Sequence, residues 1–474
     1  MSAALFRHAI PAAVTGFLYP LCFPDYDLGF LAWIMLLPLH ASLDGASPRL
    51  AFWLGWLAGL IAFAGVMFWV VNAMHLYGKM PLAASYPVMG LLAAYLGIYV
   101  AVYAWGAARL LRTIPRLAFL AAPFLWVTLE LVRTHLFSGL PWGLLGYSQY
   151  RWLPVIQFAD HAGIYGVSFL IVLVNGALFE IAAWAVARLR GRTVPVPWLT
   201  PGVAIVATAV CLWYGQAQLE PEAGEAARSV GIGLVQANID QAKKWDAAYR
   251  REAMDRHARL SGIAATQGAS KNDLIIWPEA ATPFFFELEQ DYRDEILSLV
   301  RSHDIPLLFG SPALRRYPNG RPYLMNSAYL MAQYGPVGRY DKQHLVPFGE
   351  YIPLHSSVLF FLDKLVEGIG DFEAGQVATV LTLPGKPRTP DATGLAKFGV
   401  VICYEVIFPD LVREFAAHGA DFMVTITNDA WFGQSAAPYQ HFGMVVLRAV
   451  ENRRAFARAA NTGISGFIDP HGRI

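Results

Sequence analysis

The sequence is poor in charge. Of its 474 residues, 15% are charged and 56% are hydrophobic, and the formal net charge is +1. This balance lies well to the apolar side of soluble proteins and indicates a membrane protein. Because neutralising a run of phosphates requires an excess of Lys and Arg, nucleic acid is not expected as a partner.

Cysteine is also scarce: Cys22 and Cys211 lie in apolar stretches, and Cys403 stands alone in the polar half of the chain. These positions provide neither a disulfide framework nor a cysteine-based zinc site. The sequence contains no glycine-rich phosphate loop and no metal-ligand motif either. We therefore expect no cofactor and no metal.

Long hydrophobic runs are concentrated in the first half of the chain. We predict a transmembrane helical bundle over residues 1–217 and a catalytic domain over residues 218–474. A membrane span needs roughly 20 predominantly apolar residues. Four stretches meet this length directly, namely Ala51–Met74, Leu82–Ala108, Gly163–Ala187 and Pro197–Gly215.

Three shorter stretches contain prolines: Ala9–Phe23, Leu28–Leu43 and Leu117–Val132. Each is consistent with a tilted span, a re-entrant pair or a buried helix. Counting all three as spans gives a polytopic bundle of about seven helices. Glu130 and Glu180 fall inside predicted spans, and we favour structural roles for both over functional ones.

The orientation follows from the Lys and Arg residues of the short loops. With a cytoplasmic N-terminus, the inside segments carry most of them, and only Lys79, Arg133 and Arg151 lie outside. An odd number of spans then delivers the second domain to the periplasm. We expect a multi-pass protein of the bacterial inner membrane.

The polar half alternates β-rich runs with amphipathic helical stretches, which predicts an α/β layered domain. The expected helices are Tyr249–Thr266, Tyr292–His303 and Leu411–His418. The expected strands are Val230–Asn238, Asp273–Pro278, Pro306–Ser311, Asn326–Met331, Lys397–Cys403 and Phe422–Thr427.

Three reactive side chains follow β-rich runs. Glu279 comes just past Leu274–Pro278, Lys342 lies in a polar loop with Glu350 further along it, and Cys403 ends the apolar run Gly399–Ile402. Taken singly, these residues are a loop acid, a solvated charge and a buried thiol. Together they are a base, a cation and a nucleophile, because catalytic groups of α/β domains collect at strand ends.

These three groups meet the needs of cysteine acyl chemistry. A thiol must lose its proton before it attacks. Glu279, desolvated beside Trp277, could take that proton and later return it to the leaving group. Lys342 would stabilise the oxyanion of each tetrahedral intermediate, together with a backbone N–H near Cys403.

The order Trp277-Pro278-Glu279, Asp341-Lys342 and Cys403-Tyr404-Glu405 resembles the nitrilase superfamily, with its Glu-Lys-Cys triad. The preceding spans make the chain similar to the membrane-bound branch, the apolipoprotein N-acyltransferases. Further segments that carry the resemblance are Gly139–Gln149, Gln236–Ile239 with Lys244-Trp245, Asn428–Gly433 and Arg448–Arg454.

The resemblance implies a nitrilase-like αββα sandwich with Cys403 as nucleophile, Glu279 as general base and Lys342 as oxyanion partner. It implies Glu350 as a supporting acid, with Tyr404, Glu405, Trp245 and Trp431 lining the site. Core packing is the alternative for the two tryptophans, and a structural hydrogen bond to the Cys403 loop is the alternative for Glu405.

The implied reaction has two steps and completes lipoprotein maturation. A phospholipid of the bilayer donates an acyl chain to the cysteine as a thioester, and the N-terminal α-amine of a diacylglyceryl-cysteine apolipoprotein accepts it. Pro283–Phe286 and Val358–Leu362 are too short to span, and we expect them to guide acyl chains in the outer leaflet or to be ordinary core. The chain stops at what looks like a hairpin, so it appears truncated before a final transmembrane helix.

Three other functions remain open. A membrane-tethered amidase or nitrilase would use the same groups on a small amide or nitrile and pass the acyl group to water. A transporter or scaffold would use the α/β domain only to bind ligand. A metal hydrolase using His344 or His441 is the weakest candidate, because neither lies in a metal-ligand spacing.

Overall fold

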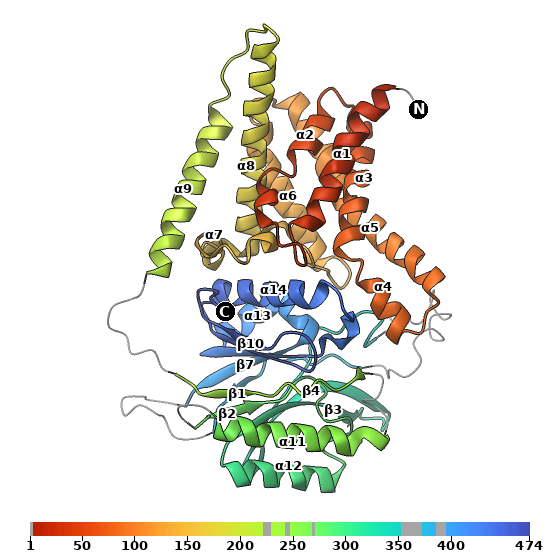
Figure 1. Cartoon of the computed structure of the whole chain (residues 1–474), viewed down its shortest axis with the longest axis vertical. Helices are drawn as coiled ribbons and strands as arrows, with labels where there is room; N and C mark the ends of the chain where they lie inside the picture. Colours follow the sequence, from red (N-terminus) through yellow and green to blue (C-terminus); the bar gives the residue numbers. More distant parts are fainter. Residues whose placement is uncertain (1–2, 221–228, 242–246, 268–270, 352–371, 385–394) are drawn as a thin grey trace. The chain divides into compact units, whose positions relative to one another are not determined.

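The computed structural model describes residues 3–220, 229–241, 247–267, 271–351, 372–384 and 395–474 (Figure 1). The chain forms two compact units. The first contains Met1–His75, Met80–Pro221 and Gln434–Leu447, and the second contains Leu76–Lys79, Glu222–Gly433 and Arg448–Ile474.

The first unit is helical. Its α-helices are α1 (Ala3–Leu21), α2 (Leu37–Leu43), α3 (Pro48–Val66), α4 (Val70–Asn72), α5 (Leu82–Thr113), α6 (Ala118–His135), α7 (Leu153–Ile156), α8 (Ala159–Leu189) and α9 (Leu199–Leu219). Two 3-10 turns, η1 (Gly29–Trp33) and η3 (Leu145–Gln149), also belong to it, as do the start of the π-helical turn η2 (Ala73–Tyr77) and most of α14 (Ala437–Asn452).

Among the described residues, four helices, α3, α5, α8 and α9, are long and apolar enough to cross a membrane. They overlap the four stretches of sufficient length in the sequence, so helices of the required length are confirmed there. The proline-containing stretches Ala9–Phe23 and Leu117–Val132 form α1 and α6. The total of about seven spans stays a prediction.

The stretch Leu28–Leu43 does not form one continuous helix. It is divided into η1 and α2, and Pro38 occupies the first turn of α2. Proline is tolerated at this position because its missing N–H would have no intrahelical partner there. The stretch is therefore not one regular α-helix, and a buried helix fits α2, because Leu39, His40 and Leu43 are buried. Whether the whole stretch crosses the membrane stays a prediction.

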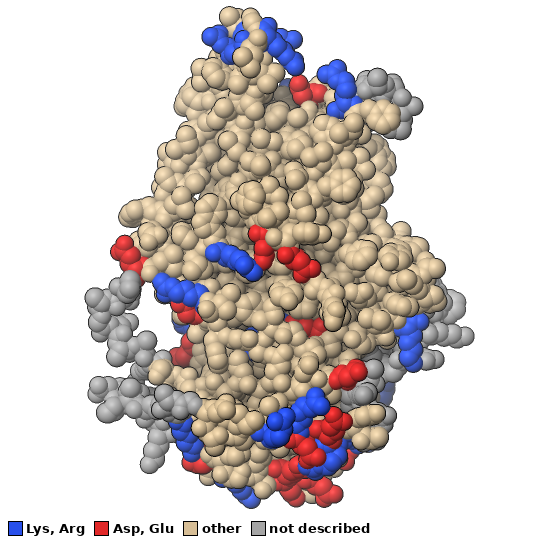
Figure 2. All heavy atoms as spheres, in the orientation of Figure 1, with Lys and Arg blue, Asp and Glu red and all other residues tan. Residues whose placement is uncertain are grey.

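Small residues let the helices of the bundle approach closely. A side-chain carbon added at Gly59 of α3 would lie 2.7 Å from the Cα of Gly97 of α5. Such contacts between small residues are the usual basis of helix packing in membranes. On the face shown in Figure 2, most of the helical unit is free of charged side chains, whereas both signs are frequent on the sheet-containing unit.

Glu130 of α6 belongs to a polar cluster inside the bundle. Its Oε1 accepts hydrogen bonds from Trp126 Nε1 at 3.0 Å and from the backbone N of Leu145 at 2.8 Å. Arg133, one turn further along, lies over the ring of Phe63. Because Glu130 ties the end of the 139–149 loop to α6, the contacts favour its structural role.

The second unit contains two five-stranded sheets. The first has the order β1-β2-β3-β4-β5, made of β1 (Ile232–Leu234), β2 (Leu274–Ile276), β3 (Leu307–Arg316), β4 (Pro322–Ala332) and β5 (Gly335–Asp341). The second has the order β10-β9-β8-β7-β6, made of β6 (Val380–Thr382), β7 (Lys397–Ile402), β8 (Phe422–Thr427), β9 (Phe456–Ala460) and β10 (Gly466–Ile468).

Both sheets are mixed. β1, β2 and β3 run parallel, as do β7, β8 and β9, and the remaining pairs are antiparallel. The helices of this half of the chain are α11 (Arg250–Thr266), α12 (Gln290–His303), α13 (Pro409–Ala417) and α14 (Ala437–Asn452), with 3-10 turns η4 (Ala247–Tyr249), η6 (Cys403–Ile407) and η7 (Asp429–Phe432).

The layers of the second unit follow the predicted αββα order. Helices α11 and α12 pack on the β1–β5 sheet, and α13 packs on β7 of the other sheet (Figure 1). Every strand and helix expected from the sequence in this half is present, although β1 is shorter than expected and β3 and β4 are longer. The sequence did not reveal β5, β6, β9, β10 or α14.

The phenylalanines of Pro283–Phe286 belong to the core. Phe284 and Phe286 are 3% and 1% exposed and pack with Trp277 and Phe309. The interpretation of this stretch as a guide for acyl chains is therefore wrong for these two residues. The second stretch proposed for that role, Val358–Leu362, lies outside the described residues.

Candidate active site

Three strand ends deliver the three candidate catalytic groups. Glu279 follows β2 after Trp277 and Pro278, Lys342 follows β5 directly, and Cys403 follows β7 directly. All three side chains are buried, with exposed fractions of 7%, 1% and 8% for their residues. The carboxyl ends of β2 and β7, in two different sheets, thus contribute to one site.

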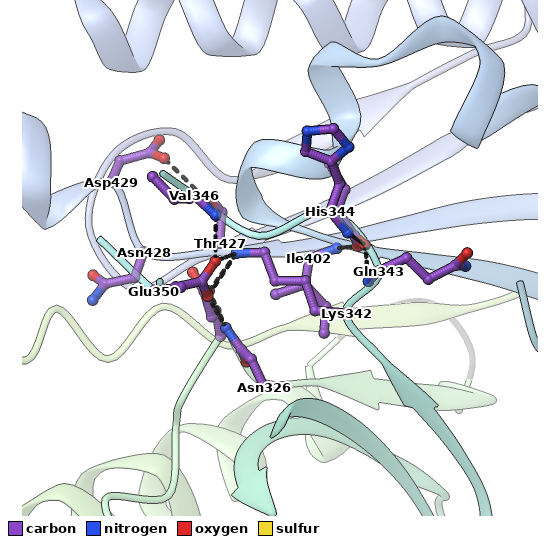
Figure 3. A network of polar contacts seen from close by, with 12 residues as sticks. Asn326, Lys342, Gln343, His344, Val346, Glu350, Ile402, Thr427, Asn428 and Asp429 are labelled. Carbon is purple, nitrogen blue, oxygen red and sulfur yellow. Dashed lines mark hydrogen bonds and ion pairs between the residues drawn. The ribbon is translucent and has the colours of Figure 1, made fainter. Parts of the chain in front are cut away.

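Lys342 is the centre of the charged cluster. Its Nζ lies 2.9 Å from Glu350 Oε2 (Figure 3). The same Nζ lies 3.6 Å from Glu279 Oε1. Burial alone would lower the pKa of Lys342, but the charges of Glu350 and Glu279 outweigh it and hold that pKa above its usual value. The ammonium is therefore charged at any working pH, although it is removed from water.

Asn326 of β4 connects the two carboxylates. Its Nδ2 donates to Glu279 Oε1 and to Glu350 Oε1, both at 2.8 Å. Glu350 also accepts from the backbone N of Val346 at 2.8 Å. With Lys342 and Asn326 as shared donors, the positions of Glu279 and Glu350 are set together. Asn326 was not singled out from the sequence, because a lone amide within a strand carries no catalytic pattern.

Cys403 occupies a strained turn. Its backbone φ is +54°, in the left-handed region that non-glycine residues seldom adopt, and Ala280 beside Glu279 has a φ of +47°. Such strain is characteristic of functional sites, where it aims a side chain out of a strand end. Both the candidate base and the nucleophile therefore stand next to a sharply turned backbone.

The Cys403 thiol is protonated at rest. Burial and the nearby charge of Glu279 raise the pKa of Cys403 to about 12, while Lys342 acts in the opposite direction. At neutral pH the thiolate is then a very minor species. Nucleophilic attack by Cys403 requires a general base, and Glu279 is a carboxylate close enough to influence this thiol.

Glu405 joins two loops of the site. Its Oε1 accepts from Tyr340 OH at 2.7 Å and from the backbone N of Gln343 at 2.6 Å, while Oε2 accepts from the backbone N of Ile402 at 2.6 Å. Burial raises the pKa of Glu405 to about 7, and these donors only partly offset it. The carboxylate bonds of Glu405 hold the Lys342 loop against the Cys403 turn.

The aromatic candidates have different environments. Tyr404 is half-buried and packs against Phe408, with ring centroids 5.2 Å apart. Trp431 is half-buried and contacts Tyr77, with ring centroids 5.1 Å apart. Trp245 lies outside the described residues. Trp431 and Tyr404 are accessible enough to line a substrate path, which remains a proposal for both.

The histidines considered as metal ligands pack on aromatic rings. His344 stacks on Phe408 with ring centroids 3.7 Å apart, and His441 stacks on Trp142. Among the residues that the structure describes, no group of three His, Cys, Asp or Glu side chains could hold a metal ion.

A second buried ion pair lies beside the site. Asp429 Oδ2 and Arg458 Nη2 are 2.7 Å apart, and both side chains are fully buried. Asp429 also accepts a hydrogen bond from Thr427 Oγ1 at 3.0 Å. From the sequence, only Trp431 of the segment Asn428–Gly433 received a role, and Asp429, Thr427 and Arg458 were not expected at the site.

Comparison with known families divides the chain in two. Residues 15–177 match the family model described as apolipoprotein N-acyltransferase N-terminal domain, and residues 231–474 match the one described as carbon-nitrogen hydrolase.

Curated relatives match nearly the whole chain. An apolipoprotein N-acyltransferase from Geobacter metallireducens is 43% identical over 99% of this chain and 86% of the relative. One from Rhizobium rhizogenes is 34% identical over 99% of this chain and 87% of the relative. Among solved structures, Saccharomyces cerevisiae Nit3, a member of branch 10 of the nitrilase superfamily, is 19% identical with a TM-score of 0.37, covering 52% of this chain and 84% of that one.

Proposed function

This chain belongs to the apolipoprotein N-acyltransferase family, and from that premise we propose that Cys403 carries the acyl group of its reaction as a thioester. The chain is thus an acyltransferase of a membrane. The observation that carries the proposal is the buried Lys342 ammonium, held between Glu279 and Glu350 and electrostatically coupled to the Cys403 thiol.

In the first step the acyl donor is a phospholipid. Glu279 takes the proton of the Cys403 thiol, and Sγ attacks the ester carbonyl of the lipid. The ammonium of Lys342 stabilises the negative oxygen of the tetrahedral intermediate. When this intermediate collapses, the ester C–O bond breaks, Glu279 returns the proton to the glycerol oxygen, and a lysophospholipid leaves.

In the second step the acceptor is the α-amine of a diacylglyceryl-cysteine lipoprotein. The amine attacks the thioester carbonyl, Lys342 again stabilises the oxyanion, and Glu279 takes the amine proton. Breaking the C–S bond yields the amide, and the proton on Glu279 returns to the thiolate of Cys403. The site therefore ends each turnover in its starting protonation state.

The supporting residues act on these three groups. Glu350 and Asn326 fix the ammonium and the base, and Glu405 holds the Lys342 loop to the Cys403 turn. Tyr404, Trp431 and Trp245 are proposed to line the path of the acyl chain, because aromatic rings offer an apolar wall with a polar edge.

The proposed location is the bacterial inner membrane, with a cytoplasmic N-terminus and a periplasmic catalytic domain. The Lys and Arg bias of the loops supports this orientation. Single reporter fusions after Arg192 and after Glu220 test it. A reporter active only in the cytoplasm should work at Arg192 and fail at Glu220, and the reverse pattern would exclude a periplasmic site.

The acyl-enzyme is tested by intact mass. Purified protein incubated with phospholipid should gain the mass of one acyl chain, and peptide mapping should locate it on Cys403. Adding a diacylglyceryl-cysteine peptide should remove the adduct and produce the acylated peptide. A wild-type protein that gains no acyl mass, yet releases ammonia from a small amide, would identify an amidase instead.

The other two cysteines provide matched controls. Cys22 and Cys211 are buried in the helical unit. Cys22→Ala and Cys211→Ala should keep the adduct, whereas Cys403→Ala should lose it with an unchanged melting temperature. An adduct that persists in Cys403→Ala would show that another residue carries the acyl group.

A further inference from the structure

Thr427 lies beside the nucleophile because of the strand register. β7 and β8 are parallel, and Ile402 is paired with Ile426, so the next residues along the two strands are Cys403 and Thr427. A hydrogen bond with the Thr427 side chain acts to lower the pKa of the Cys403 thiol. Thr427 is fully buried, so its hydroxyl depends on the protein for partners.

The same hydroxyl has a second partner. In this structure Thr427 Oγ1 donates to Asp429 Oδ1 at 3.0 Å, as Figure 3 shows. A hydroxyl group has a single hydrogen to donate, and it can rotate about the C–O bond. Thr427 therefore donates either to Asp429 or to Cys403 at one time, and while it donates to Asp429 its oxygen can only accept from the thiol.

We propose that Thr427 is a hydroxyl switch that stabilises the Cys403 thiolate when Glu279 has taken its proton. While Cys403 is a thiol, Thr427 donates to Asp429. When the sulfur becomes negative, the hydroxyl rotates and donates to Sγ instead, so that no proton leaves Thr427. This inference rests on the proposed function, because it assigns Thr427 a positioning role for the nucleophile of that reaction.

Arg458 makes the rotation possible. Asp429 loses one donor when Thr427 turns to the sulfur, but its Oδ2 keeps the ion pair with Arg458 Nη2 at 2.7 Å. A fully buried carboxylate without this cation would bind the hydroxyl far more strongly, because unpaired buried charge is costly. Arg458 is in turn fixed by donating from Nε to the carbonyl of Ile464 at 3.0 Å.

Three charges act on the Cys403 thiol. Glu279 comes from the β2 end and Lys342 from the β5 end, while Asp429 comes from the β8 end. Glu279 and Asp429 oppose the thiolate, and Lys342 favours it. Glu405, on the same turn as Cys403, is bonded to the Lys342 loop and to Ile402. A hydroxyl donor at Thr427 supplies stabilisation that appears only after the proton has left.

The switch is tested by the rate of alkylation of Cys403 with iodoacetamide at one alkaline pH, without phospholipid, using the full chain in detergent. A hydrogen bond to a charged group is worth roughly a 10- to 100-fold change in an equilibrium. Thr427→Val keeps the shape and removes the donor, so its alkylation and its acylation by phospholipid should each be about 10- to 100-fold slower. Thr427→Ser keeps the donor and should react within a few-fold of wild type.

Thr425 provides the control for loss of a buried hydroxyl. It lies two residues earlier on β8, is fully buried, and its Oγ1 has no hydrogen-bond partner among the described residues. Thr425→Val should react like the wild type. Asp429→Asn should alkylate faster than wild type, because it removes a negative charge that opposes the thiolate.

The outcomes separate the switch from the proposed function. Alkylation of Thr427→Val at the wild-type rate would overturn the switch, and so would equal slowing of Thr427→Val and Thr427→Ser. Either result leaves the acyl-enzyme of the wild type untouched. Absence of an acyl adduct in the wild type would instead remove the proposed function, while the alkylation rates still report on the hydroxyl. Melting temperatures of each variant exclude unfolding as the cause.

Discussion

Lys342 Nζ lies 2.9 Å from the carboxylate of Glu350, and both side chains are shielded from water. A buried ammonium without a partner would give up its charge or destabilise the fold. Glu350 therefore allows a full positive charge to stand next to the thiol. Glu279 lies further from the ammonium, at 3.6 Å, which leaves its carboxylate available as a base.

Replacing Glu350 by Gln tests this division of roles. Without the Glu350 charge, we expect the Lys342 ammonium to move to Glu279 and to compete with the thiol proton for that carboxylate. Loss of a preorganised oxyanion donor slows catalysis by about 10²- to 10³-fold, and we expect acylation to slow by an amount approaching this range. The rate of acyl-adduct formation by mass spectrometry measures it.

Glu287→Gln is the matched control for Glu350→Gln. Glu287 is a partly exposed carboxylate that pairs with Arg315 and Arg339 on β3 and β5. Its loss should leave acylation unchanged, since surface ion pairs contribute little. Equal slowing of both variants would mean that Glu350 acts only through the general stability of the domain.

Glu279→Gln and Lys342→Ala should both abolish the acyl adduct, but with opposite effects on the resting thiol. The charge of Glu279 raises the pKa of Cys403 and that of Lys342 lowers it. Alkylation of Cys403 by iodoacetamide should therefore be faster in Glu279→Gln and slower in Lys342→Ala than in the wild type. If the alkylation rate changed in the same direction in both variants, the Glu279 and Lys342 charges would not act on the Cys403 sulfur in opposite ways.

The raised pKa of Glu405 predicts that the acylation rate depends on pH. Burial raises the pKa of Glu405 to about 7, so the folded protein takes up a proton there as the pH falls through that value. A protonated carboxyl cannot accept all the bonds that hold the Lys342 loop to the Cys403 turn. Acylation should therefore decline below about pH 7 through loosening of these loops.

The stability that Glu405 contributes should change with pH in the opposite direction to the acylation rate. Between the ordinary glutamate pKa of about 4.3 and the folded value, the folded state binds more protons than the unfolded state. The contribution of Glu405 to stability is thus largest at low pH and falls as the pH rises to about 7. Relative to Glu405→Gln, the melting temperature of the wild type should drop over this interval. A constant difference between the two proteins would show that Glu405 does not titrate there.

Strand ends made the central site predictable from the sequence. Glu279, Lys342 and Cys403 each follow a β-rich run, and the carboxyl ends of such strands bring side chains together. Asn326 and Arg458 were not predictable in this way, because each lies within a strand and reaches the site through its place in the sheet. Only the pairing of β4 with β5 and of β8 with β9 brings them there.

Length and apolar composition predicted the helices of the bundle where these signals were unambiguous. The break in Leu28–Leu43 was less clear, because the run is apolar throughout and only Pro38 marks the start of α2. Phe284 and Phe286 show the converse problem. A short aromatic run has the same sequence pattern whether it faces lipid or packs under a sheet. Only the tertiary contacts with Trp277 and Phe309 distinguish the two environments.

A substitution at Gly463 tests whether the position of the Asp429 carboxylate affects the site. A side-chain carbon at Gly463 would lie 2.4 Å from Asp429 Oδ2, and the glycine has a φ of +95°. Gly463→Ala should displace the Asp429 carboxylate and weaken its hold on the Thr427 hydroxyl, so that Cys403, as in Asp429→Asn, is alkylated by iodoacetamide faster than in the wild type. Gly419 has a φ of +88° with nothing within 4 Å of the added carbon, so Gly419→Ala carries the backbone strain without the clash. Strain of this kind costs about 1–3 kcal/mol in either variant. If both variants lose stability and only Gly463→Ala is alkylated faster, the change in rate comes from the displaced carboxylate. Equal alkylation rates in the two variants would show that the position of Asp429 does not matter to the Cys403 thiol.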